Sequence, residues 1–158
     1  MADRSQWPAP ARTMAGAVEE AVTAASDGAR PAFDEALAVL VRVDRAQLAT
    51  LLGTATRELL ERAHPDGLDA EGAEIVLAAA TKAARPWFPE VDDDLLLRAL
   101  TGALGIGEID DARVDPDAVL AHGLVLLAEL ARVTGVRPRA AVDAAMAELI
   151  RAQTVELP

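Results

Sequence analysis

Apolar residues recur at every third or fourth position along most of this 158-residue chain, which is the spacing of one face of an α-helix. Proline, glycine and aspartate interrupt the pattern and divide it into seven predicted helices. These cover about residues 11–27, 32–43, 45–63, 70–84, 93–104 and 116–134, with a last helix that begins at 138. No strand pattern stands out. We therefore predict an all-α fold, a compact bundle of six to seven short helices with an alanine and leucine core.

Residues that favour helix ends support these boundaries. Aspartate side chains accept hydrogen bonds from the first backbone N–H groups of a helix, and glycine adopts the left-handed conformation that ends one. The predicted caps at helix starts are Asp44, Asp69, the stretch Asp92–Asp94 and Asp115. Gly28 and Gly135 follow the first and sixth helices, where we expect them to end the helix.

Residues 1–10 contain two prolines among polar residues, and we expect a flexible N-terminal tail there. Residues 11–158 then form a single helical domain. The helix over 11–27 presents a narrow stripe built mainly of alanine, which has little volume. That stripe suits a partner or a second copy of the chain as well as it suits the core, so this helix is a candidate for a peripheral position.

Composition changes the picture of the core. The chain has 36 alanines and 21 leucines, and only 3% of its residues are aromatic. Small side chains let helix axes approach closely, so we expect a tight bundle without a large internal cavity. The chain also has 14 arginines against one lysine, which together with its many alanines is typical of a GC-rich bacterial genome.

The net charge of the chain indicates which classes of partner to expect. The net charge is −11, and the densest basic stretch is Arg137-Pro-Arg139. Nucleic acids and anionic membrane surfaces need a basic patch, so neither is an expected partner. An acidic surface instead steers a protein toward a basic partner. The chain has no cysteine, no signal peptide pattern and no apolar run long enough to span a membrane, so we expect a cytoplasmic protein.

The residues that usually carry catalysis are scarce. Ser5 and Ser26 are the only serines, one in the expected tail and one at a helix end, and tyrosine is absent. Most acidic residues stand where helices begin, and none is expected inside an apolar stripe. No spacing of histidines and carboxylates matches a metal site. We therefore expect no metal, no cofactor and no catalytic residue, and a carboxylate or histidine enzyme is the third-ranked alternative.

His122 is the one histidine placed in the middle of a predicted helix, with Gly123 beside it and Glu129 farther along the same face. Two interpretations are open. His122 and Gly123 can line a ligand pocket in which the histidine moves a proton or contacts the ligand. Alternatively, His122 is a partly buried residue bonded to a carboxylate or a carbonyl, and Gly123 allows another helix to pack closely.

Trp87 and Phe88 form an adjacent aromatic pair held between Pro86 and Pro89. Tryptophan anchors many protein interfaces because it buries a large, rigid surface at low entropic cost. A pair restricted by two prolines can be presented outward to a protein partner. It can also fold back and fill one end of a bundle whose core has few aromatics.

These observations favour a non-enzymatic protein–protein interaction or regulatory module, with Trp87 and Phe88 as candidate partner-binding residues. The alternative is a small-molecule-binding helical domain with a pocket near His122 and Gly123. Self-association into a homodimer is compatible with both functions, since the helix over 11–27 offers a surface that a second copy could cover.

Overall fold

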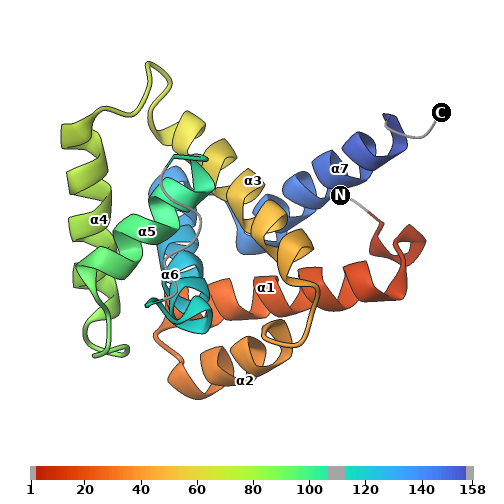
Figure 1. Ribbon diagram of the computed structural model, residues 1–158, viewed down its shortest axis with the longest axis horizontal. Coiled ribbons are helices and arrows are strands. Elements are labelled where there is room, and N and C mark those ends of the chain that lie inside the picture. Colours follow the sequence, from red (N-terminus) through yellow and green to blue (C-terminus); the bar gives the residue numbers. More distant parts are fainter. Residues whose placement is uncertain (1–2, 107–112, 156–158) are drawn as a thin grey trace.

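A computed structural model describes residues 3–106 and 113–155, which form helices and turns without strands (Figure 1). The described helices are the short 3₁₀ helix η1 (Arg4–Gln6), α1 (Ala9–Asp27), α2 (Arg30–Leu40), α3 (Arg45–Ala63), α4 (Ala70–Ala84), α5 (Asp93–Ala103), α6 (Pro116–Thr134) and α7 (Pro138–Val155). The predicted all-α fold is therefore confirmed. Most of the stretch between the fifth and sixth predicted helices, residues 107–112, lies outside the described residues.

The aspartate caps define four helix starts. Asp44 accepts a hydrogen bond from the N–H of Gln47 at 3.0 Å, and Asp69 accepts one from Gly72 at 2.7 Å. The caps of α5 and α6 are Asp92, which accepts from Asp94 and Leu95, and Asp115, which accepts from Asp117. Gly28 and Gly135 have φ angles of 66° and 69°, so both end their helices in the left-handed conformation, which costs glycine little.

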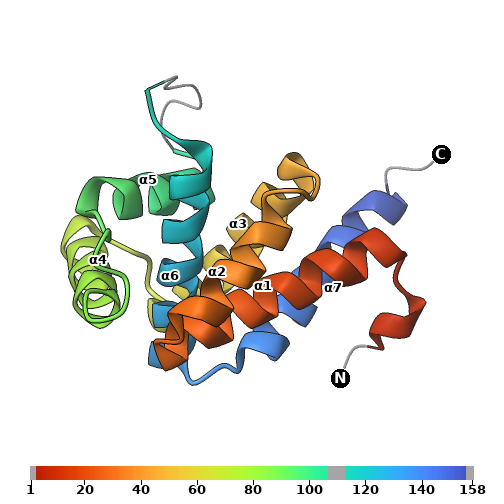
Figure 2. The same cartoon turned by 90° about the horizontal axis from the view of Figure 1, so that it is seen from below.

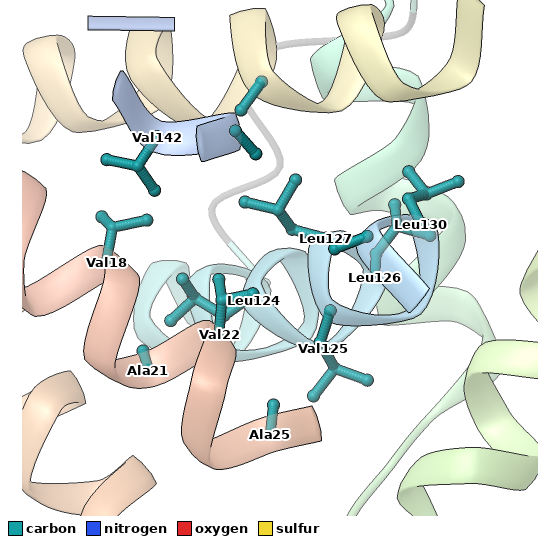
Figure 3. Packing of buried hydrophobic residues seen from close by; sticks show 14 of the residues in the cluster. Val18, Ala21, Val22, Ala25, Leu124, Val125, Leu126, Leu127, Leu130 and Val142 are labelled. Atoms are coloured by element: carbon teal, nitrogen blue, oxygen red, sulfur yellow. The ribbon is translucent and has the colours of Figure 1, made fainter. Parts of the chain in front are cut away.

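Helix α6 lies in the middle of the molecule, with α4 and α5 on one side and α1 and α3 on the other (Figures 1 and 2). It is the helix with the longest buried run, from Leu120 to Ala131, in which Gly123 alone is not fully buried. Figure 3 shows Leu124, Val125 and Leu127 on the side of α6 that faces α1 and Val142 of α7, whereas Leu126 and Leu130 lie on the side away from α1. The core is thus built from many modest aliphatic contacts.

Helix α1 is packed into this core. Its buried face consists of Met14, Ala15, Ala17, Val18, Ala21, Val22, Ala24 and Ala25. The helix contacts α2, α6 and α7, so it does not take the peripheral position considered from the sequence. The physical reason is that alanine side chains let neighbouring helices approach α1 closely on several sides. The many van der Waals contacts made at this short distance compensate for the small area that each alanine buries.

The N-terminal segment also differs from the expected flexible tail, at least from residue 3 onward. Arg4 pairs with Glu19 of α1 at 2.6 Å and with Asp143 of α7 at 2.7 Å, and Trp7 packs against the core. Ion pairs that are mostly shielded from water hold better than exposed ones, so they fix this segment on the two helices. Residues 1–2 lie outside the described part of the chain.

Candidate functional site

The turn between α4 and α5 directs Phe88 inward. The N–H groups of Trp87 and Phe88 both donate to the carbonyl of Ala84, at 3.1 and 2.7 Å, which wraps the turn back over the end of α4. Phe88 is 6% exposed and belongs to the core, whereas Trp87 is half-buried. Of the two candidate partner-binding residues, Trp87 is therefore the one that reaches the surface.

Three of the four aromatic residues, Phe33, Trp87 and Phe88, gather into one cluster. The ring of Phe33 from α2 lies 5.0 Å from the ring of Trp87, edge to face, and 5.9 Å from that of Phe88. The Phe88 ring is also 5.3 Å from the His122 ring. Such edge-to-face and tilted pairs add to the stability of buried aromatic surface. Within this cluster, the rings of Phe33 and Phe88 both pack against the ring of Trp87.

Arg30 fastens the same turn to α2. Its guanidinium donates to both carboxylate oxygens of Glu90 at 2.8 Å, bonds Asp34 at 2.9 Å and lies 5.0 Å from the centre of the Phe88 ring. The hydrogen bonds from Arg30 lower the pKa of Glu90 to about 2. The bond to Glu90 is in turn the main cause that raises the pKa of Arg30. The turn that carries Trp87 is therefore bonded both to the end of α4, through Ala84, and to α2, through Arg30.

His122 is buried, at 2% exposure, and both of its ring nitrogens are bonded. Nδ1 lies 2.6 Å from the carbonyl of Ala118, and Nε2 accepts the N–H of Asp92 at 3.0 Å. A carbonyl can only accept and an amide can only donate, so the proton resides on Nδ1. This geometry is that of the histidine bonded to a carbonyl which we considered from the sequence, and it ties the start of α5 to α6.

Gly123 stands where α5 passes over α6. A Cβ atom at this position would lie 3.9 Å from the Cβ of Ala99 on α5. Neither of the two hollows described below is lined by His122 or Gly123. A pocket at these two residues therefore stays a prediction, while both ring nitrogens of His122 bond backbone groups.

The first of the two hollows is a groove beside Trp87 with a volume of about 250 Å³. It lies where the C-terminal ends of α1 and α4 meet the second half of α6. Its lining is mostly apolar and small: Ala25, Gly28, Ala80, Ala83, Ala84, Trp87, Val125 and Ala128, together with the polar Ser26, Asp27, Glu129 and Arg132. Gly28 faces the Trp87 ring across this lining, and a Cβ atom added at Gly28 would lie 3.6 Å from that ring.

Glu129 brings a buried charge to this groove. It is 4% exposed, although it stands between the leucines of α6. Arg132, one turn later, donates through Nε to Oε2 at 3.1 Å and through its terminal nitrogen to Oε1 at 2.5 Å. The Arg132 side chain itself is 66% exposed. Its hydrogen bonds to Glu129 raise the pKa of Arg132.

Glu129 corrects one expectation from the sequence, that no acidic residue lies inside an apolar stripe. Asp143 is a second exception, buried beside Arg4. A signal was present in both cases, because a carboxylate among apolar residues with an arginine three or four positions along the helix fits an ion pair. For Glu129 that arginine is Arg132, and for Asp143 it is Arg139, which precedes it.

The second hollow is more open to solvent, and four of its six lining residues are polar or charged. It has a volume of about 450 Å³ and is lined by Ala78, Thr81, Lys82, Arg85, Pro86 and Asp93. The Thr81 hydroxyl donates to Asp93 at 2.7 Å and joins α4 to α5 across its base. Because Lys82, Arg85 and Asp93 are exposed, water screens whatever charge this surface could offer to a ligand.

Residues 3–106 and 113–155 hold no group of three or more histidine, aspartate or glutamate side chains arranged to bind a metal ion. Within the same residues, no single helix combines the length and hydropathy of a membrane span. Only α6 and α7 taken together do so, and a bend of 110° separates them.

The candidate site is thus a small apolar groove with one aromatic wall and one ion pair, in which the carboxylate is buried and the arginine is exposed. The groove combines residues from three helices that are distant in the sequence. No known protein family, curated protein or solved structure matches the chain.

Proposed function

We propose that this protein is a non-enzymatic interaction module that receives a side chain of a protein partner in the groove beside Trp87. The observation that carries the proposal is the half-buried Trp87, which forms a wall of an apolar groove and packs against the rings of Phe33 and Phe88. Interfaces concentrate their binding energy on such aromatic anchors. A wall that is already ordered loses little conformational entropy when a partner binds.

The size of the groove favours a partner side chain over a free small molecule. Pockets that enclose drug-sized ligands have volumes of roughly 300–1,000 Å³, and this groove has about 250 Å³. A single side chain that projects from a partner fits a space of this kind, while the rest of the partner rests on the surrounding surface. The hydrogen bonds of His122 are consistent with the non-enzymatic assignment, because both ring nitrogens already have structural partners.

Filling the groove tests the proposal. Ala83 is exposed at the rim, so Ala83→Gln adds volume there without changing the charge or the core. Ala144→Gln, on the exposed face of α7 and outside the groove, is the matched control. Each variant is compared with the wild type for affinity capture from the native host, and captured partners are identified by mass spectrometry and purified.

We expect the purified partner to bind the wild type and Ala144→Gln equally, and Ala83→Gln at least about tenfold more weakly, as measured by isothermal titration calorimetry. Trp87→Ala should weaken binding as well while the chain remains helical. A partner that binds Ala83→Gln as tightly as the wild type would contradict the proposal, and so would the absence of any partner.

A further inference from the structure

The groove contains the buried carboxylate of Glu129, and a site that bound only an apolar side chain would have no use for this charge. Removing a charge from water is costly unless the protein supplies a partner. Arg132 supplies it here, but its guanidinium belongs to a side chain that is 66% exposed. Water can take over the hydrogen bonds of such a side chain at little cost. Glu129 is therefore fixed in the core, and its cation is exchangeable.

The residues around Glu129 match one kind of side chain. Small apolar residues, among them Ala84 and Ala128, line the groove and can contact an aliphatic stem. Trp87 offers the aromatic surface over which a cation is attracted. Asp27 adds a second carboxylate to the lining. Against these two acids stands Arg132 alone, so the charged residues of the groove sum to −1.

We infer that the groove recognises an arginine side chain of the protein partner, whose guanidinium replaces that of Arg132 on Glu129. This inference rests on the proposed function and specifies the chemistry of the partner. Arg132 already shows that the Glu129 carboxylate accepts two hydrogen bonds from one guanidinium. Arginine fits better than lysine, because its planar group both forms paired hydrogen bonds and stacks on an aromatic ring.

Charge on the rest of the molecule acts in the same direction. A net charge of −11 attracts a basic partner over a longer range than the groove itself and raises the rate of encounter. The groove then selects which basic side chain is held. Binding should consequently weaken as salt is added, while discrimination between arginine and an uncharged side chain of the same shape should remain.

The test uses two short peptides that differ at one position, arginine in one and citrulline in the other, because citrulline keeps the shape and loses the charge. Binding is followed by NMR on the ¹⁵N-labelled full chain, through the indole N–H signals of its two tryptophans. Trp87 reports on the groove. Trp7 contacts the core from the N-terminal segment and serves as an internal control.

We expect the arginine peptide to shift the Trp87 signal and leave that of Trp7 in place, with an affinity at least about tenfold higher than that of the citrulline peptide. Glu129→Gln, which keeps the side-chain volume, should remove this preference, and its folding is checked by circular dichroism. Equal binding of the two peptides, or a preference that survives Glu129→Gln, would overturn the inference.

The outcome is distinguishable from that of the proposed function. If the two peptides bind equally while Ala83→Gln still loses the purified partner, the groove is an interaction site that does not select arginine. If neither experiment shows binding, both the inference and the proposed function fail.

Discussion

His122 and Glu129 are two buried polar residues on the same helix, seven positions apart, and they differ in the groups that satisfy them. His122 bonds the carbonyl of Ala118 and the N–H of Asp92, two backbone groups that are fixed by helices. Glu129 bonds the side chain of Arg132, which is largely in water. The two residues are about equally buried, and they differ in the exposure of the group that each one bonds.

The two aromatic residues of the α4–α5 turn divide in the same way. Phe88 lies on the His122 side, in contact with that ring and sealed from solvent. Trp87 lies on the Glu129 side and lines the groove. The first half of α6 thus bonds and packs against core groups, and the second half lines the groove in which we propose that a partner side chain binds.

The largest expected effect is the difference in stability loss between the Phe88→Ala and Trp87→Ala variants. Phe88→Ala removes a ring from the core and should lower the free energy of unfolding by about 3–5 kcal/mol. Trp87→Ala should cost clearly less, about 1–2 kcal/mol, because part of the indole is already exposed. Urea unfolding followed by circular dichroism measures both. Equal losses would show that Trp87 is as much a core residue as Phe88.

A second pair of variants compares the two buried polar residues directly. His122→Leu leaves the N–H of Asp92 without its acceptor and should cost about 2–3 kcal/mol. Glu129→Leu removes a buried charge, and Arg132 can turn into water, so the free energy of unfolding should change by less than about 1 kcal/mol in either direction. The same unfolding experiment applies. A large loss for Glu129→Leu would mean that its ion pair is as structural as the bonds of His122.

The smallest expected effect is on the pH dependence of stability, and it comes from the ion pair between Arg30 and Glu90 that holds the α4–α5 turn on α2. Arg30 lowers the pKa of Glu90 from 4.5 to about 2. A carboxylate with a lowered pKa stabilises the fold above its unfolded pKa, and this stabilisation is lost as the pH falls from 4.5 toward 2. Glu90→Gln should therefore be less stable than the wild type at neutral pH, and the difference should shrink through this acidic range.

Unfolding curves of the wild type and Glu90→Gln across that pH range test the sign. Because the ion pair is exposed, the difference at neutral pH is expected to be small. If the difference in the free energy of unfolding between the two proteins stays constant down to the lowest pH, the interaction of Arg30 with residue 90 does not depend on the charge of Glu90.

The helices could be predicted from the sequence because their signals are local. Asp69 and Asp115 each bond a backbone N–H within three positions of themselves, and Gly135 needs only its own backbone conformation to end α6. The predicted and observed bounds of α6 are both 116–134. Alanine and leucine at helical spacing then suffice to specify an all-α fold.

The groove could not be predicted in this way, because its residues come together only through tertiary packing. Gly28, Trp87 and Glu129 belong to three separate stretches of the chain, and none of the three marks a groove by itself. The N-terminal segment is similar, since Arg4 finds Asp143 across 139 positions of sequence. Alanine-rich helices offer many equivalent ways to pack, so such long-range pairings are not visible in the hydrophobic pattern.

The measurement that tests this account most directly is the affinity of the arginine peptide for Arg132→Gln compared with the wild type, read from the Trp87 indole signal. If Arg132 is an exchangeable occupant of the Glu129 carboxylate, its removal frees the carboxylate for the guest. The affinity should then rise several-fold. An affinity that falls, or one that does not change, would contradict the claim that a guest takes the place of Arg132.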